Sequence, residues 1–247
     1  SSSELTLNAR ARTALLQNSL PQDIRDVVSD PHIRLLRGKA GTGRTDLLVL
    51  RALHVKEQHP DSSVLVTTMN ETLYAHRLKP EMAALQPEIR VELFEDLCRR
   101  LFRKHTGRVP HPMKPEHTIK AMMNNGMEVS AGEVPFLAEE ITWMKETGRT
   151  SRKKYLEVPR KGRSTRLASV EKKRMLRLFR AYRKHLDDRF CYDMTDVRSR
   201  VRSFLERGLD PGETFDVILA ADAHGFAPGS IVILRQLLKP GGQLFLA

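Results

Sequence analysis

Strand-like segments and amphipathic helices alternate near both ends of this chain, and this alternation limits the fold more than any other feature of the sequence. The clearest strand-like segments, Val64 to Thr68 and Phe215 to Ala221, are short and rich in apolar residues. A third, Ile33 to Arg37, leads through a glycine-rich turn into Thr45 to Glu57, whose leucines have helical spacing. Alternation of this kind predicts an α/β fold with a parallel sheet flanked by helices.

The other expected elements divide the chain into three segments. We expect a helix over Thr72 to Leu85, another over Ser230 to Leu238, and a last strand over Gln243 to Ala247 after the turn Lys239 to Gly242. From about Leu97 to Gly208 the apolar residues have helical spacing and no strong strand signal is present. Within this tract we expect a loop over Lys153 to Thr165. The predicted division is residues 1–96 for the first part of a sheet domain, 97–208 for a helical insertion, and 209–247 for the second part of the sheet domain.

The charge balance indicates a polyanionic partner. The chain has 42 Lys and Arg residues against 30 Asp and Glu, a formal net charge of +12. Binding to phosphates releases condensed counterions, so a basic excess favours nucleic acid. The two cysteines form no metal-binding pattern, and no apolar run approaches the roughly 20 residues that span a bilayer. We therefore expect a cytoplasmic, intracellular protein without a membrane partner.

A glycine-rich segment between the first expected strand and helix has the layout of a phosphate-binding loop. Gly38 to Thr45 reads GKAGTGRT, which fits G-x-x-x-x-G-K-T except for arginine at the lysine position. Glycines let backbone N–H groups surround an anion, and the helix N-terminus adds donors. Arginine keeps the positive charge but displaces it, because its guanidinium is longer and forked. The predicted nucleotide-binding residues are Gly38, Ala40, Gly41, Thr42, Gly43, Arg44 and Thr45, with Thr45 also the candidate Mg²⁺ ligand.

A second candidate motif follows the strand-like segment that ends at Ala221. P-loop ATPases carry two carboxylates at the end of such a strand, for Mg²⁺ and for the attacking water. Here Asp222 is the one carboxylate at the tip, Ala221 takes the metal-binding position, and His224 lies nearby. Asp222 is therefore the candidate catalytic residue, while an ordinary surface role is the simpler interpretation of His224.

The order of these motifs resembles the N-terminal half of UvrD/Rep-type superfamily 1 DNA helicases, over roughly Leu5 to Ala247. Val64 to Asn70 and Leu93 to Cys98 are similar to the family motifs between the two ATPase motifs, and the helical middle is similar to the family's inserted subdomain. The resemblance implies a P-loop NTPase (RecA-like) sheet, ATP with Mg²⁺ as ligands, and DNA as partner. It also implies DNA contacts by Thr67, Thr68, Asn70 and Phe94.

The departures from the family pattern fall on nucleotide chemistry. Arg44 replaces lysine, Ala221 and Asp222 replace an Asp-Glu pair, and Leu93 and Glu95 replace the threonine and histidine of the intermediate motif. The sequence also ends before the family's second motor domain, which would contribute arginines to hydrolysis. The resemblance thus implies weakened hydrolysis, and possible supply of a motor domain by a protein partner.

The middle of the chain concentrates positive charge. From Arg149 to Lys184 there are fifteen Lys or Arg residues and two acids, Glu157 and Glu171. Like charges at this density repel unless an anion offsets them, although a solvated surface is the alternative. No pattern for reading bases is visible, so we expect sequence-independent binding of single-stranded or junction DNA. The predicted DNA-binding residues of this region are Arg160, Lys161, Arg163, Arg166, Lys172 and Lys173.

Three functions follow from these observations. The first is a nucleic-acid-binding module, able to bind nucleotide but impaired in hydrolysis. The second is a fragment of an active DNA helicase, and the third is an inactive helicase-like scaffold for a protein partner. A methyltransferase is disfavoured, because its glycine loop and Leu238-Lys-Pro-Gly-Gly242 turn would lie much closer together in sequence.

Overall fold

The computed structural model describes residues 29–30, 35–36, 43–157, 159–160 and 165–247. These residues form two compact units. The sheet unit contains the described residues up to Leu97 together with Phe204–Ala247, and the helical unit is Cys98–Ser203, compared with the predicted 97–208. The two boundaries fall within helices: the one after Leu97 within α6 (Phe94–Thr106), and the one after Ser203 within α11 (Met194–Glu206).

The sheet unit contains four parallel strands in the order β2-β1-β3-β4. Their bounds are β1 Val64–Thr68, β2 Arg90–Leu93, β3 Phe215–Ala221 and β4 Leu238–Leu246. The predicted parallel α/β sheet is confirmed, and the structure gives β1 and β3 the predicted limits.

The described part of the segment before the glycine loop lies beside β4. Leu35 forms a parallel bridge with Leu246, and Leu36 N donates to Leu246 O at 2.8 Å. β4 therefore lies between Leu35 and β3. An apolar strand such as β4 gains by this interior position, where it is paired on both sides.

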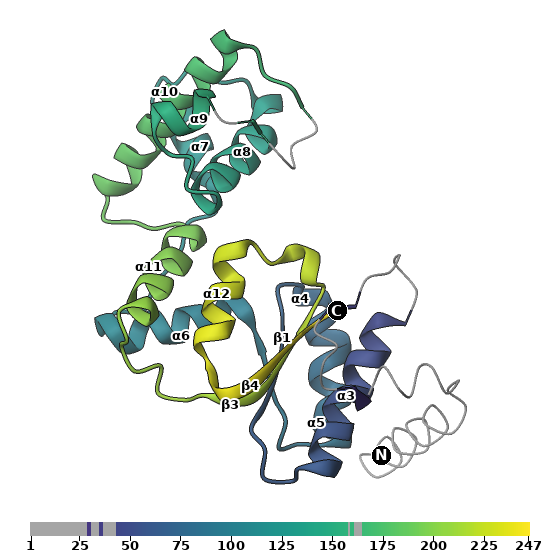
Figure 1. Cartoon of the computed structure of the whole chain (residues 1–247). Coiled ribbons are helices and arrows are strands. Elements are labelled where there is room, and N and C mark those ends of the chain that lie inside the picture. The colour runs from purple at the N-terminus through teal and green to yellow at the C-terminus, as the bar shows by residue number, and fades with distance from the viewer. Residues whose placement is uncertain (1–28, 31–34, 37–42, 158, 161–164) are drawn as a thin grey trace. The chain divides into compact units, whose positions relative to one another are not determined.

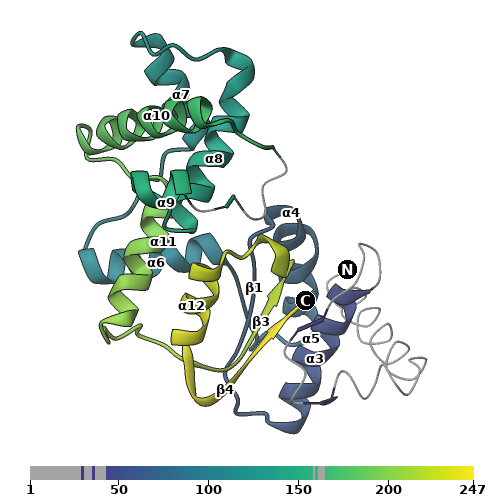
Figure 2. The same ribbon diagram turned by 45° about the horizontal axis from the view of Figure 1, so that its top comes forward.

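Helices cover both faces of the sheet, with α3 (Arg44–Gln58) and α5 (Lys79–Leu85) on one face and α12 (Pro228–Gln236) on the other (Figures 1 and 2). Side chains of a strand point alternately to its two faces, and all five residues of β1 are buried, as a doubly covered sheet requires. On the first face Leu48 and Ala52 of α3 pack with Val66 and Leu219. This core holds the carboxyl ends of β1 and β3 in fixed register, with Thr68 opposite Ala221.

The chain between β1 and β2 is helical, as expected for 72–85, but it is not one α-helix. A short α-helix, α4 (Glu71–Leu73), is followed by a π-helical turn, η1 (Tyr74–Leu78), and then by α5. π-Helical turns are rare and are often found at functional sites. Here the turn directs Arg77 toward Asp46 in the first turn of α3, where the two form an ion pair.

The strand β4 begins earlier than predicted because it includes a bulge. Phe215 pairs with Leu238 and Val217 pairs with Gln243, so residues 239–242 form an irregularity within the strand where we expected a separate turn. A β-carbon at Gly242 would lie 2.9 Å from the carbonyl oxygen of Lys239 and 3.1 Å from those of Phe215 and Asp216. Glycine is thus required where the bulge passes close to β3.

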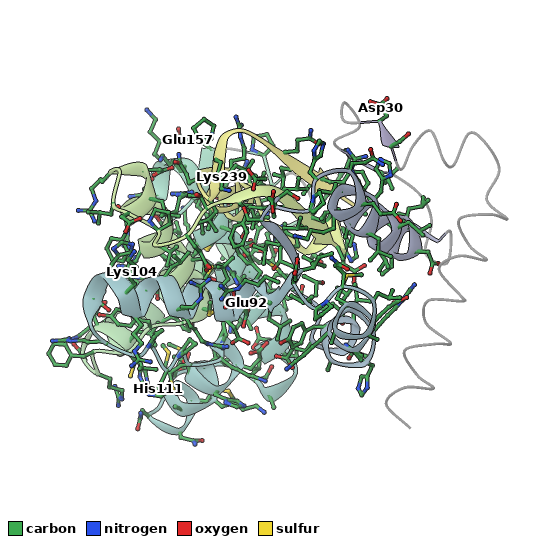
Figure 3. The ribbon with its side chains drawn as sticks, turned by 90° about the horizontal axis from the view of Figure 1, so that it is seen from below. Asp30, Glu92, Lys104, His111, Glu157 and Lys239 are labelled. Carbon is green, nitrogen blue, oxygen red and sulfur yellow. The ribbon has the colours of Figure 1, made fainter. Side chains whose placement is uncertain are left out.

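The Asp216 carboxylate joins three segments at the amino-terminal edge of the sheet. Its Oδ2 accepts hydrogen bonds from the backbone N and the Oγ of Ser63, each at 2.7 Å, and lies 2.7 Å from Lys239 Nζ (Lys239 is labelled in Figure 3). The Lys239 ammonium and the Ser63 donors lower the pKa of Asp216 to about 2. The ionised form is therefore favoured in the folded protein.

Replacing Asp216 with asparagine is expected to lower the free energy of unfolding at neutral pH by about 1 kcal/mol, after allowance for solvent screening of this partly exposed group. Because the folded-state pKa of Asp216 is depressed, its contribution is present above the ordinary value of 3.8 and is lost as pH falls toward 2. Urea unfolding followed by circular dichroism should show the gap between wild type and variant closing over that range. The control Asp61→Asn, in an exposed turn, should show no gap; an unchanged gap for Asp216→Asn at low pH would contradict the assignment.

The helical unit is built around α7 (Pro115–Asn124), α8 (Val134–Glu146), α9 (Arg152–Glu157) and α10 (Ser169–Asp187). Its core combines Ile119, Ile141, Met175 and Phe179 with other apolar side chains of these helices. The expected loop over Lys153 to Thr165 is wrong at its start, where α9 forms. Its Tyr155 is fully buried in the core, and that anchor outweighs the basic, loop-like composition.

Candidate functional site

The carboxyl-terminal edge of the sheet has the topology of a ligand site. From β1 the chain crosses to β2 on one side, and from β3 it crosses to β4 on the other. The strand order therefore reverses between β1 and β3, and ligands of open parallel sheets bind at such a switch point, beyond the carboxyl ends of the strands. Leu35 is parallel to β4, so the chain leaves it at this same edge and α3 begins there.

Two polar residues meet at the switch point. Asn70 follows β1 and Asp222 follows β3, and Asn70 Nδ2 donates to Asp222 Oδ2 at 2.9 Å although 152 residues separate them in sequence. The Asn70 side-chain oxygen also caps α4 by accepting from Leu73 N at 3.0 Å, and its backbone N donates to Thr68 Oγ1 at 3.1 Å. Two hydrogen bonds thus orient the Asn70 side-chain amide and a third holds its backbone, so that Asn70 and the Asp222 carboxylate meet at the strand tips.

The backbone at Asp222 is strained. Its φ of 55° and ψ of 52° are in the left-handed region, which non-glycine residues seldom occupy. The next residue, Ala223, donates its N–H to Ala247 O at 2.8 Å, and η3 (Ala223–Gly225) follows. Exposed His224 lies in this turn. Strain of this kind is found at ligand sites more often than elsewhere, because the surrounding structure must hold it in place.

The start of α3 contributes the described part of the predicted phosphate loop. Gly43 has a φ of 75°, and its carbonyl accepts from Leu47 N at 3.0 Å, so glycine is required to turn the chain into the helix. Arg44 and Thr45 form the first turn and are half-buried. The Arg77 ion pair offsets the negative charge of Asp46 in this turn, which would otherwise repel an anion. The remaining predicted loop residues, Gly38, Ala40, Gly41 and Thr42, lie outside the described residues.

The chemistry available at this edge is limited. Asp222 supplies a carboxylate at the strand tips and Thr45 a hydroxyl on α3, whereas Ala221 is buried and has no ligating group. Among the described residues no group of three or more His, Cys, Asp or Glu is placed to hold a metal ion. The described groups at this edge are therefore one carboxylate, one hydroxyl and the N-terminus of α3, whose backbone N–H groups can donate to an anion.

Three of the residues implied as DNA contacts are buried in the sheet unit. Thr67, Thr68 and Phe94 each have a relative exposure of 0%, and the Phe94 ring packs edge-on against Phe226, with centroids 5.2 Å apart. Asn70 is exposed. A DNA strand bound along this edge of the sheet would therefore contact Asn70 directly. Contact with the side chains of Thr67, Thr68 and Phe94 would require local rearrangement.

The helical unit holds the second candidate site, and its structure sorts the basic residues of the middle tract into two groups. Members of the first group support the fold. Arg160 Nε donates to the fully buried Glu140 at 2.8 Å, Arg174 pairs with Glu133, and Lys172 Nζ donates to Leu156 O at 3.4 Å. The Arg174 hydrogen bond lowers the pKa of Glu133 to about 2. These cations have their charge or donors engaged within the protein.

The second group points to solvent along one face of α10. Residues three and four apart lie side by side on a helix, so Lys173, Arg177, Arg180 and Lys184 form a continuous stripe. All four are exposed. Within the described residues Lys173, Arg177 and Arg180 have no ion-pair partner, and Lys184 pairs with Asp188 at 2.9 Å. We call these four residues the α10 stripe.

The α10 stripe was only partly predicted. Lys173 was among the predicted DNA contacts. Arg177, Arg180 and Lys184 were counted in the basic tract from Arg149 to Lys184 but were not predicted as individual contacts. Their helical spacing was the signal that could have separated them from the cations engaged in the fold. Of the other predicted contacts, Arg166 is exposed, and Lys161 and Arg163 lie outside the described residues.

Within the described part of the chain, no helix has the length and apolar character needed to cross a bilayer. Comparison of the sequence with protein-family models and with curated proteins found no match.

Proposed function

We propose that this chain is a nucleic-acid-binding module, built on a RecA-like sheet with an inserted helical subdomain, which binds single-stranded or junction DNA without sequence preference. The observation that carries this proposal is the α10 stripe. Three of its four cations have no acidic partner among the described residues, and adjacent members lie three or four residues apart. Aligned cations of this kind fit a phosphate backbone, which bears one charge per nucleotide.

Nucleotide binding belongs to the proposal as a second, weaker activity. The switch point between β1 and β3, with Asn70 and Asp222 at the strand tips and α3 beginning at the same edge, supports the binding of a triphosphate there. Arg44 and Ala221 depart from the groups that position Mg²⁺ and the γ-phosphate, so hydrolysis is impaired. DNA-stimulated turnover of about 1 s⁻¹ or faster, at the low end for enzymes, would favour the alternative of an active helicase fragment.

Titration of a labelled single strand of about 16 nucleotides, followed by fluorescence anisotropy at several salt concentrations, tests the DNA activity. Changing all four residues of the α10 stripe to glutamine is expected to weaken binding about 10- to 100-fold at roughly 100 mM salt. The slope of log K against log salt should become shallower by about 3, because each phosphate contact on a single strand contributes about 0.7.

The matched control removes the same charge elsewhere in the helical unit. Arg103, Arg108, Lys114 and Lys120 are exposed and lie outside α10. Their replacement by glutamine should weaken binding less than about threefold, through the loss of net charge alone. Equal losses in the two variants would show that only the overall charge matters. Absence of binding by the wild type at roughly 100 mM salt would refute the proposed function and favour a protein-binding scaffold.

A further inference from the structure

An unusual aromatic residue lies where the chain leaves α10. Phe190 is 90% exposed, and its φ of 52° is in the left-handed region. Among the described residues, the only other non-glycine residue with positive φ is Asp222, at the switch point. A bulky side chain is a genuine outlier in this region, and an exposed phenyl ring also leaves apolar surface in water.

Hydrogen bonds define the conformation of Phe190. Phe190 N donates to Asp187 O at 3.1 Å, and Cys191 N donates to Leu186 O at 2.9 Å. These two bonds form a Schellman motif, in which Phe190 occupies the left-handed position that glycine usually fills. The motif fixes the backbone that carries the ring, so the ring is held outward at the end of the helix rather than on a flexible loop.

Two hollows lined by cations include residues next to Phe190 in the chain. A hollow of about 470 Å³ is lined partly by Arg180, Arg183 and Lys184, and one of about 210 Å³ partly by Arg183 and Arg200. The two share Arg183 and Asp187, whose carbonyl bonds Phe190, and the second also includes Cys191, which follows it. Residues that precede and follow Phe190 in the chain therefore line these hollows, and Lys184 at the end of the α10 stripe lines the larger one. The acids at the hollows are Asp187, Asp188 and Asp196, of which Asp188 pairs with Lys184 and Asp196 with Lys145.

From this geometry we infer that Phe190 stacks on a nucleobase of a single strand whose phosphates follow the α10 stripe. A single exposed ring that follows the basic helix α10 fits this role better than it fits an apolar protein interface, which would need a patch of several hundred Å². Aromatic rings stack on bases of any sequence, so the contact adds affinity without base reading. The inference rests on the proposed function and identifies its substrate as single-stranded nucleic acid with accessible bases.

The test separates stacking from phosphate contact by varying the ring and the ligand together. Wild type and the variants Phe190→Tyr, Phe190→Leu and Phe190→Gly are titrated with an oligothymidylate and with an abasic oligonucleotide of the same length and charge. We expect the tyrosine variant to bind oligothymidylate within about twofold of wild type, and the leucine and glycine variants to bind about 5- to 30-fold more weakly. All four proteins should bind the abasic ligand equally.

The glycine variant also tests whether the weakened binding reflects a damaged fold. Glycine relieves the left-handed strain, so Phe190→Gly should raise the midpoint of thermal unfolding by about 2–4 °C while it weakens binding. Equal binding of oligothymidylate by wild type and Phe190→Leu would overturn the stacking role but leave the proposed function intact. Failure of the wild type to bind either ligand would overturn both.

Discussion

Replacing Arg160 with methionine is expected to destabilise the helical unit by about 3–5 kcal/mol. The Arg160 side chain is 6% exposed and pairs with Glu140, whose side chain is 0% exposed. Tyr155 OH donates to the same carboxylate at 2.8 Å, and burial beside this carboxylate raises the pKa of the Tyr155 hydroxyl above its ordinary value. Without Arg160, a fully buried carboxylate would lose the cation that pairs with it, which is why the expected cost is large. Trp143, the only tryptophan, lies in the same unit and provides the fluorescence signal for denaturant titration.

The double variant Glu140→Leu with Arg160→Met is the matched control. Replacing a buried ion pair with apolar groups of similar volume is often neutral or stabilising, so the double variant should recover most of the lost stability. Trp143 lies 5.9 Å from the Arg160 guanidinium, so circular dichroism should accompany the fluorescence measurement. If Arg160 supports the fold, the double variant binds DNA with wild-type affinity. A tenfold loss of DNA affinity in this folded variant would instead support the sequence-based prediction of a DNA contact.

The strands show how far local sequence could predict this fold. β1 and β3 are buried runs of apolar residues with small or polar residues at their ends, and such runs are readable from sequence alone. β2 was missed, because Arg90–Leu93 has four half-buried residues of alternating polarity and pairs with β1 alone in the described sheet. Its identity depends on hydrogen bonds to a distant strand, which no local pattern records.

The candidate sites show the same limit. Asn70 and Asp222 were each identified from motifs, but their direct hydrogen bond depends on the strand order, which places β1 beside β3. Charge density identified the basic tract as a whole, yet Arg160 and Lys173 have opposite environments because only one of them faces a buried acid. Nothing in the sequence indicated an exposed ring at Phe190 except that the expected helix ends without a glycine. The exposure and left-handed backbone of Phe190 arise from the hydrogen bonds that cap the end of α10.

Replacing Asp193 with alanine is the second change expected to have a large effect, about 3–5 kcal/mol on the helical unit. Asp193 is 1% exposed. Its Oδ2 accepts from Lys145 Nζ at 2.6 Å and from Tyr182 OH at 2.7 Å, while Oδ1 accepts from Asp196 N at 3.0 Å and caps α11. Burial and the neighbouring Asp193 charge raise the pKa of the Tyr182 hydroxyl well above its ordinary value, so Tyr182 stays a donor. Alanine would remove the cap and leave two buried donors without this acceptor.

Asparagine at position 193 separates charge from hydrogen bonding. It retains an oxygen for the cap or for Tyr182 but loses the charge opposite Lys145, which keeps Asp196 at 2.6 Å. We therefore expect Asp193→Asn to cost about half as much as Asp193→Ala in denaturant titrations followed by Trp143 fluorescence. Equal costs would show that the charge, and not the set of hydrogen bonds, is the stabilising feature.

The Asp193 network also connects stability to DNA binding, because Tyr182 anchors the buried face of the helix that carries the α10 stripe. Cations aligned on one helix face repel one another, and a bound phosphate backbone offsets that repulsion only when α10 is folded. Saturation of Asp193→Asn with single-stranded DNA at about 100 times its Kd should therefore restore about 2.7 kcal/mol of stability to the helical unit. The same DNA should restore far less to a protein that combines Asp193→Asn with the glutamine changes in the α10 stripe. Equal restoration in the two proteins would mean that DNA binds elsewhere.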